Sequence, residues 1–445
     1  GDFRVSVHYL VVIVGVSLLG VGLMRLQAPK RMQSNEAMVV IGSIFVFSPL
    51  MLTWPVMASG LGFLDALFET VSAVTTTGLS TTDTLLNKPD TFLFSRAWMQ
   101  WVGGLGIVVL STAAMIQPGL AAKRLDITED YEDDLIGSTR ANARRVFAIY
   151  AILTVLSVLF LGISGNNWFE SLLYSFAAVS TGGFSPHDAS LQGLETHYAQ
   201  FIVIVFSMAG GVSLALYHRA YRYGWKAAYR DRQIQAFLAA GLLTTLMMTL
   251  FLWYQDGLNW TSALRHGALN ALSAQSTAGF ASQDISKVGD GSKLTLILAM
   301  AVGGSIGSTA GGIKILRVLI VFRLLYLLLN RTGATSNAVS EARLSGRRLE
   351  ADEIQNAMCL IILFIFFIVI SWLPFIALGH APLDSLFEVV SALGTAGLSA
   401  GLTGGELHPL LKGILCADML LGRLEIVVWL VFLYPGTWIG HRKEE

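Results

Sequence analysis

Long apolar runs separated by short polar segments dominate the hydrophobic pattern of this chain. Nine such runs occur, at residues 5 to 24, 37 to 58, 97 to 116, 146 to 163, 199 to 217, 236 to 254, 294 to 330, 357 to 378 and 410 to 439. Most approach the roughly 20 residues that an α-helix needs to cross about 30 Å of hydrocarbon. The pattern therefore predicts an all-α polytopic membrane protein with nine spanning segments.

Four shorter apolar segments lie between these runs. They are residues 63 to 75, 168 to 180, 261 to 276 and 382 to 394. Segments of this length are too short to span and are typical of re-entrant elements. Irregular backbone at membrane depth is tolerated only where it is buried in protein or lines a wet cavity. We therefore expect each segment to enter the membrane and the loop after it to turn the chain back outward.

A tetrad that ends in glycine closes each half-length segment. The four tetrads are Thr75-Thr76-Thr77-Gly78, Ser180-Thr181-Gly182-Gly183, Ser276-Thr277-Ala278-Gly279 and Gly394-Thr395-Ala396-Gly397. Every copy has Thr two residues before the last glycine and Ala five residues before it. Four copies of one loop predict four related quarters of one structure. The alternative is four surface turns, because Thr and Gly are common turn residues, but turns alone do not require the same columns four times.

Glycine and threonine suit these loops for binding a cation. Glycine permits backbone angles that aim carbonyl oxygens at a central axis, and rings of carbonyls replace the hydration shell of an ion. Threonine adds a hydroxyl acceptor. We therefore predict an ion-binding filter made of Thr76, Thr77, Gly78, Thr181, Gly182, Gly183, Thr277, Ala278, Gly279, Thr395, Ala396 and Gly397.

Composition and charge support this membrane interpretation and give it an orientation. The chain is 54% hydrophobic and 13% charged, against about 25% charged in soluble proteins. Lys and Arg concentrate in cytoplasmic loops. The loops on the side away from the tetrads hold 22 basic residues and the tetrad side holds six, so the tetrads are predicted to face outward. Both cysteines, Cys359 and Cys416, lie in apolar runs, so no disulfide framework is implied.

A glycine-rich segment interrupts the apolar run from 294 to 330. Five glycines lie within residues 303 to 312, and each costs about 1 kcal/mol relative to Ala in a helix interior. We therefore expect a loop that acts as a gate, made by Gly303, Gly304, Gly307, Ser308, Thr309, Gly311, Gly312 and Lys314. A phosphate-binding loop would need Gly-Lys followed by Ser or Thr, which this segment lacks. The competing interpretation is a kink for close helix packing.

Arg423 lies inside the last apolar run, in the sequence Gly422-Arg423-Leu424-Glu425. An arginine at the centre of a membrane costs about 2.5 to 3.5 kcal/mol on insertion scales, so it normally faces a cavity or a partner. Two roles are open. Arg423 forms a structural pair with Glu425 or with backbone carbonyls, or it steadies the gate and places positive charge on the permeation path.

Acidic residues near the tetrads give a weaker signal. Asp83, Asp188 and Asp284 each follow a tetrad glycine by five residues. A ring of carboxylates concentrates cations at a pore mouth, whereas a single Asp also hydrogen-bonds its own turn. Glu69 and Glu388 precede their glycines by nine residues in two quarters only, which favours a structural role. No paired acid and base or nucleophile motif occurs, so an enzyme acting on lipid-linked substrates is disfavoured.

With these features the chain resembles the Trk/Ktr/HKT superfamily of K+ transporters, which includes bacterial membrane subunits and plant and fungal relatives. The resemblance covers about residues 36 to 439 and implies four fused helix, pore-helix, helix repeats around one pore. It makes Gly78, Gly183, Gly279 and Gly397 the filter glycines and residues 307 to 314 the intramembrane gate. A similar Gly-Arg-x-Glu motif faces the pore in the family. Plant members that prefer Na+ often carry Ser at the first glycine, so Gly78 favours K+.

The resemblance also implies a division of the chain. Residues 1–35 would form an outer transmembrane helix with a cytoplasmic linker, and the four repeats would occupy 36–141, 142–232, 233–352 with the gate at 303–312, and 353–445 with a short cytoplasmic tail. Family members usually have two helices before the first repeat, so either one helix is missing here or the chain represents a shorter variant.

The expected function is uptake of K+ across a bacterial inner (plasma) membrane, with K+ as the transported ion and no cofactor. The resemblance implies a homodimer and a cytosolic nucleotide-binding regulatory subunit of the TrkA type; membrane lipid surrounds the chain, and no nucleic acid is involved. The alternative is a Na+-permeable or ion-coupled symporter, K+/H+ or K+/Na+, because discontinuous helices also build midplane ion sites. Such symporters more often show two related halves than four quarters.

Overall fold

The fold is almost entirely helical. The computed structural model describes residues 2–25, 34–115, 135–224, 226, 229–332, 342–344 and 347–439. The linker after residue 25, the acidic stretch at 126 to 134 and the tail after residue 439 lie outside these residues. In the described part, the only strands are β1 (Arg343–Leu344) and β2 (Arg347–Arg348), a small antiparallel hairpin next to α13.

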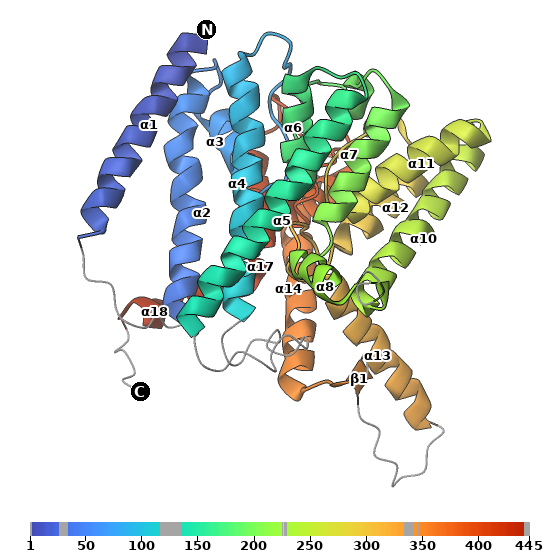
Figure 1. The fold of residues 1–445 in the computed structure, drawn as a ribbon. Coiled ribbons are helices and arrows are strands. Elements are labelled where there is room, and N and C mark those ends of the chain that lie inside the picture. Colours follow the sequence, from blue (N-terminus) through green and yellow to red (C-terminus); the bar gives the residue numbers. More distant parts are fainter. Residues whose placement is uncertain are drawn as a thin grey trace.

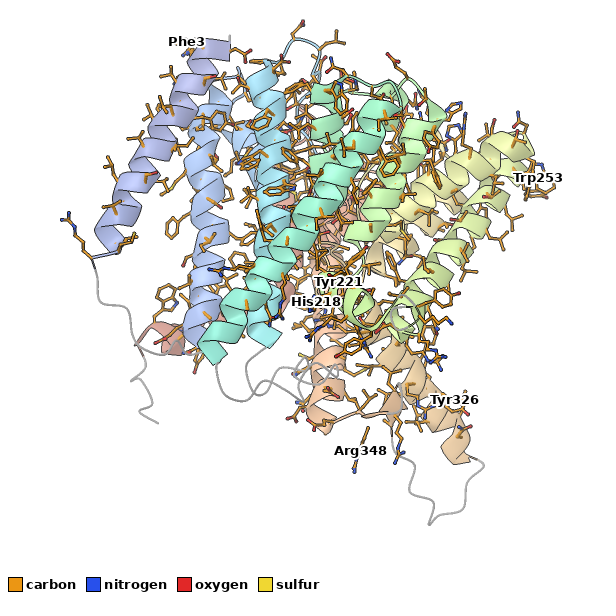
Figure 2. All side chains as sticks on the ribbon, viewed as in Figure 1. Phe3, His218, Tyr221, Trp253, Tyr326 and Arg348 are labelled. Atoms are coloured by element: carbon orange, nitrogen blue, oxygen red, sulfur yellow. The ribbon has the colours of Figure 1, made fainter. Side chains whose placement is uncertain are left out.

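Six helices in the described residues are long and apolar enough to cross a membrane without a break. They are α1 (Asp2–Leu23), α2 (Ser34–Met57), α4 (Asp90–Met115), α5 (Leu135–Ile163), α10 (Arg232–Tyr254) and α14 (Ala351–Ala377). α1 lies at the edge of the bundle beside α2 (Figure 1). Side chains at the periphery, such as Phe3 and Trp253, point away from the bundle (Figure 2) and are exposed, as expected for surfaces that face lipid.

The other three apolar runs are not continuous helices. The first forms α7 (His197–Gly210) and α8 (Leu214–Tyr223), which meet at 87°. The second forms α12 (Asp290–Ala301) and α13 (Ile315–Thr332), and the third forms α16 (Pro409–Arg423), α17 (Glu425–Leu433) and α18 (Pro435–Ile439). Six of the nine predicted spanning segments are therefore unbroken helices in the described residues and three are interrupted, because an apolar composition does not show where backbone hydrogen bonding stops.

The four half-length segments form short helices at the predicted places. They are α3 (Phe63–Val74), α6 (Trp168–Val179), α11 (Trp260–Gln275) and α15 (Pro382–Leu393). Local chemistry fixes their starts. Asn167 accepts a hydrogen bond from the N–H of Phe169 at 2.9 Å, and Asn259 accepts one from Ser262 at 2.8 Å. Pro382 occupies the first turn of α15, where its missing N–H costs nothing.

Each half-length helix packs against a helix of the preceding quarter. The contacts pair α4 with α6, α7 with α11, α12 with α15, and α16 with α3. Two of these contacts carry ion pairs of buried lysines: Lys412 Nζ lies 2.5 Å from Asp65 Oδ1, and Lys293 Nζ lies 2.6 Å from Asp384 Oδ1. Because the last quarter contacts the first, the packing closes into a cycle.

Gly103 gives a direct test of the contact between α4 and α3. A Cβ at Gly103 would collide with the carbonyl oxygen of Val74, whereas a Cβ at Gly106, on the same helix, would have nothing within 4 Å. We expect Gly103→Ala to destabilise the protein by about 1 to 3 kcal/mol, as overpacking does. Gly106→Ala should leave stability unchanged or raise it slightly, because Ala is the better helix former. Thermal unfolding in detergent measures both, and equal melting temperatures would contradict this packing.

Candidate ion-binding site

Each half-length helix ends in the same hydrogen-bonded turn. In the first quarter the N–H of Thr76 donates to Ala73 O at 3.0 Å, and the N–H of Thr77 donates to Ser72 O at 2.9 Å. This pair of bonds is the Schellman arrangement, which requires a left-handed residue after the helix, usually Gly. Here that residue is threonine in all four quarters: φ is 52° at Thr76, Thr181 and Thr277 and 47° at Thr395.

The alanine column supplies the main-chain acceptors of this turn. The carbonyls of Ala178, Ala274 and Ala392 accept the N–H of Thr181, Thr277 and Thr395 at 3.0 Å each, as Ala73 does in the first quarter. All four alanines are fully buried. A β-branched residue with positive φ is a genuine outlier. Such strain, of order 1 to 3 kcal/mol, persists only where the surroundings impose it, and it clusters at functional sites.

The four loops meet in a closed cycle. A Cβ on Gly78 would collide with the carbonyl oxygen of Gly182, and one on Gly183 with that of Ala278. A Cβ on Gly279 would collide with Ala396 O, and one on Gly397 with Thr77 O, which returns to the first loop. The four glycines have φ between 76° and 90°. The structure therefore brings all twelve predicted filter residues together, with backbone facing backbone and no room for a side chain at the glycines.

In two loops, a buried glutamate hydrogen-bonds the segment that follows the tetrad. Glu69 accepts the Ser80 hydroxyl at 2.5 Å and the N–H of Thr81 at 2.9 Å. Its other oxygen pairs with Arg96 Nε at 3.0 Å. Glu388 accepts the N–H of Ala400 at 2.9 Å in the same manner. These carboxylates bind loop backbone, which fits the structural role expected for them.

In the other two quarters, neutral residues hydrogen-bond the backbone that follows the tetrad. Asn270 accepts the N–H of Ser282 at 2.8 Å. Tyr174 donates its hydroxyl to Ser190 O at 2.8 Å. Three kinds of side chain, Glu, Tyr and Asn, therefore anchor the four loops from one aligned position.

The three aspartates after the tetrads do not behave alike. Asp188 accepts the N–H of Leu85, in the first quarter, at 2.8 Å, and Asp83 accepts the N–H of Gly405, in the fourth, at 3.1 Å. Asp284 instead accepts the Ser286 hydroxyl of its own turn at 2.6 Å. That hydrogen bond, together with Lys287, lowers the pKa of Asp284. Two of the three therefore join neighbouring loops, and one stabilises its own turn.

The glycine-rich segment between α12 and α13 is a loop, as expected. It is bonded to the break between α7 and α8: the N–H of Ser305 donates to Gly211 O at 3.0 Å, that of Thr309 donates to Gly210 O at 3.1 Å, and that of Leu214 donates to Gly307 O at 3.1 Å. Unpaired backbone groups are costly inside a membrane. The backbone groups left free at the two helix breaks therefore hydrogen-bond one another.

The loop also touches the left-handed threonines. Thr309 Oγ1 lies 3.3 Å from Thr181 Oγ1, and the N–H of Gly311 donates to Thr277 Oγ1 at 2.8 Å. A Cβ on Gly311 would collide with the Thr395 hydroxyl. Three of the four left-handed threonines therefore contact this loop directly. The hydroxyls of Thr76 and Thr395 are buried and have no hydrogen-bond partner among the described residues.

The remaining predicted gate residues hold the loop together. The N–H of Gly303 donates to Ile313 O at 2.9 Å, and the Ser308 hydroxyl donates to Ser305 O at 2.6 Å. Lys314 Nζ donates to Ala310 O. Gly307 and Gly312 have φ of 75° and 67°. A Cβ on Gly304 would meet Gly211 O at 2.5 Å.

Arg423 is the last residue of α16 and is 4% exposed. Its Nη1 donates to Thr309 O at 2.6 Å, and its Nη2 donates to Gly103 O at 3.4 Å. The expected pairing with backbone carbonyls is therefore present, whereas the Glu425 side chain lies outside the described residues. Arg423 joins the glycine-rich loop to α4.

Buried glutamines are the site residues that the sequence analysis missed. Gln275 Nε2 donates to Val302 O at 2.5 Å, and Gln233 Oε1 accepts the N–H of Ile306 at 3.3 Å, so both support the glycine-rich loop. Gln100 contacts the second filter loop. A polar amide inside or beside an apolar segment could have indicated these residues, because a buried amide requires hydrogen-bond partners.

Glu388 offers a test of loop anchoring. It is fully buried and also accepts the hydroxyls of Ser399 at 2.7 Å and Thr403 at 2.6 Å. A glutamine at 388 would direct its NH2 group, itself a donor, at some of these donors, so the hydrogen bonds there would be lost. Each hydrogen bond to a charged group contributes about 1.5 to 3 kcal/mol to stability. We expect Glu388→Gln to lower the melting temperature in detergent by several degrees, while Glu406→Gln, at an exposed position, does not. An unchanged melting temperature for Glu388→Gln would refute the anchoring role.

Known proteins resemble this chain over most of its length. Residues 12–435 match the TrkH family, described as cation transport protein. The chain is 30% identical to the Trk system potassium uptake protein TrkH of Escherichia coli K12 over 420 residues, which cover 90% of this chain and 83% of that protein. It is 31% identical to TrkH of Halomonas elongata over 407 residues, covering 89% and 83% of the two chains.

Similarity extends to an archaeal protein and to a solved structure. An uncharacterized cation transporter of Methanocaldococcus jannaschii is 28% identical and covers 93% of this chain and 85% of its own length. The crystal structure of the potassium transporter TrkH from Vibrio parahaemolyticus matches the fold with a TM-score of 0.84 at 24% identity, over 98% of this chain and 100% of that one. The fold is thus that of a multi-span transporter, and the chain belongs to the TrkH family of cation transport proteins.

Proposed function

We propose that this chain takes up K+ through a path enclosed by its four tetrad loops, with the twelve filter residues as the ion site. The carrying observation is the closed cycle of glycine-to-carbonyl contacts, in which each loop meets the next and the fourth meets the first. The names of the relatives, Trk system potassium uptake proteins, support K+ as the ion.

The helix ends add an electrostatic reason for a cation at this place. Each half-length helix ends at its tetrad, so four helix C-termini converge on the cycle of loops. The C-terminus of a helix carries a partial negative charge of about half an elementary charge. A cation that exchanges its water for carbonyl oxygens is therefore stabilised further by four helix dipoles.

We assign the chain to four repeats around this path, after an outer helix. The helix order within each quarter supports the assignment, since every half-length helix follows a long unbroken helix and precedes a further helix. α5 begins at Leu135, upstream of the expected boundary after residue 141, so the second repeat is better taken to start with α5. The other expected boundaries, after residues 35, 232 and 352, are kept.

The glycine-rich loop and Arg423 form the gate in this proposal. The loop contacts three filter threonines, and Arg423 holds it through the Thr309 carbonyl. Ion passage therefore requires the loop to move away from the threonines. The hydrogen bonds to Gly210 and Gly211 are the connections that such a movement breaks.

The cellular setting is assigned from the charge distribution and from the family. We place the chain in a bacterial inner membrane with its tetrads facing outward, on the distribution of Lys and Arg. A homodimer and a cytosolic nucleotide-binding subunit of the TrkA type remain proposals from the family resemblance. The Trk system named for the relatives is consistent with such a subunit.

Flux measurements on the purified chain in liposomes test the function. We expect an inward K+ gradient to drive K+ movement at a rate at least tenfold above that of Na+ under the same gradient, measured by ion-sensitive dyes. Protein-free liposomes are the control. Equal K+ and Na+ flux would support the Na+-permeable alternative, flux that depends on a second ion gradient would support a symporter, and absent flux would refute transport of K+ by this chain.

Arg423 tests the gate. Arg423→Ala removes the donor to Thr309 and a positive charge beside the path, so we expect K+ flux per folded protein to rise severalfold. Arg423→Lys retains the charge and should give a smaller change. The exposed Arg222 of α8 provides the control, since Arg222→Ala should leave flux unchanged. Unchanged flux in Arg423→Ala at equal protein content would remove Arg423 from the gate.

A further inference from the structure

Gln100 of α4 is a fully buried glutamine that uses both ends of its amide on one filter loop. Its Nε2 donates to the carbonyl oxygen of Gly182, and its Oε1 accepts the N–H of Phe184 at 3.2 Å. The side-chain amide thus bonds the carbonyl of one residue and the N–H of the residue two positions later, as a neighbouring β-strand would. It fixes the orientation of the peptide groups around Gly183.

The sequence of the second loop is matched to this amide. Gly182 occupies the column that holds Thr77, Ala278 and Ala396 in the other loops. A Cβ at Gly182 would lie 2.5 Å from Cδ of Gln100 and 2.6 Å from its Oε1. The second tetrad therefore has glycine, in place of Thr or Ala, at the position where a methyl group would displace the Gln100 amide.

The contact is unique among the four loops in the described structure. Within the described residues, the carbonyls of Thr77, Ala278 and Ala396 accept no side-chain hydrogen bond. The Gly182 carbonyl thus differs from its three counterparts in having a bound donor. A held carbonyl has less freedom to move toward a smaller ion, and the donor takes up part of its acceptor capacity.

Neighbouring residues of α4 make this helix a rigid support. Arg96, one turn before Gln100, pairs with Glu69 of the first quarter, and its guanidinium lies 3.7 Å from the ring centre of Phe184. Gly103, one turn after Gln100, offers its carbonyl to Arg423. Residues at this spacing share one helix face. One face of α4 therefore contacts the first loop, the second loop and the gate arginine.

We propose that Gln100 is a positioning residue that fixes the Gly182 carbonyl and thereby sets the preference for K+ over Na+. The inference rests on the proposed K+ uptake through the four loops. Carbonyls that stay at the distance suited to K+ replace its hydration shell but fit the smaller Na+ poorly. Without the amide, the second loop adapts to Na+ and selectivity falls.

A pair of matched glutamine variants tests the proposal. Gln100→Met keeps the length of the side chain and removes both hydrogen bonds. Gln200 of α7 is the control, because it is also buried, at 7% exposed, and its Nε2 donates to a backbone carbonyl, Leu191 O, at 2.9 Å outside the tetrads. In liposomes, we expect Gln100→Met to lower the ratio of K+ to Na+ flux at least tenfold. Gln200→Met should keep the parent ratio.

The flux ratio does not depend on how many molecules are folded, so it separates positioning from loss of protein. A parent ratio in Gln100→Met, or an equal fall in both variants, would overturn the proposal while K+ uptake itself stands. A parent chain that conducts no K+ would overturn both. Where Gln100→Met is not recovered from membranes, Gln100→Ala gives the same measurement.

A double-mutant cycle then tests whether Gln100 acts through Gly182. Gly182→Ala alone should lower the ratio, because its methyl group displaces the amide. In a Gln100→Ala background the same change should have a much smaller effect, since the space is vacant. Residues in contact give such non-additive effects, whereas independent residues add. Additive effects on the logarithm of the ratio would contradict the pairing.

Discussion

The left-handed threonine at the end of each half-length helix is the constraint on which the site depends. It allows two backbone hydrogen bonds to close the helix and turns the chain sharply, and the glycine two residues later meets the next loop. Positive φ is costly for a β-branched residue, so the turn exists only because dense packing imposes it. The buried alanines lie within this packing, and their carbonyls accept the N–H groups of the threonines.

The membrane makes a second demand, that every interrupted helix find partners for its backbone. Three apolar runs are interrupted, and the backbone groups at the first two interruptions, between α7 and α8 and between α12 and α13, hydrogen-bond each other. The ends of α7 and α8 bond the loop between α12 and α13, and Arg423, at the break after α16, donates to that loop. Lipid offers no hydrogen bonds, so breaking one span beside another costs less than breaking either alone. This mutual dependence explains why flexible loop residues, the bend at Gly210 and Gly211, and a buried arginine occur in one place.

The sequence predicted the repeated parts well and the connections between them poorly. The half-length helices and the glycine-rich loop were predictable because length and glycine content limit what a helix can do. The sharp bend after Gly210 was not, since Gly210 and Gly211 lie within an otherwise apolar run. The partners of Glu69, Asp83 and Asp188 come from loop backbone, in two cases from another quarter, and a linear sequence does not specify which loops become neighbours. Gln100 was missed because a single amide in an apolar run has no period.

The four quarters share one loop backbone with Thr, Ala and Gly at fixed positions, but the side chains that anchor the loops are not the same in every quarter. The closed cycle of loop contacts needs a repeated main-chain geometry, so glycine and left-handed threonine recur in every loop. Anchoring needs only some hydrogen-bonding group of the right reach, so Glu69, Tyr174, Asn270 and Glu388 serve equally at one aligned position. Once the anchors differ, the loops need not be equally stiff. A chain with four fused quarters can therefore adjust one loop alone, which an assembly of identical subunits cannot do.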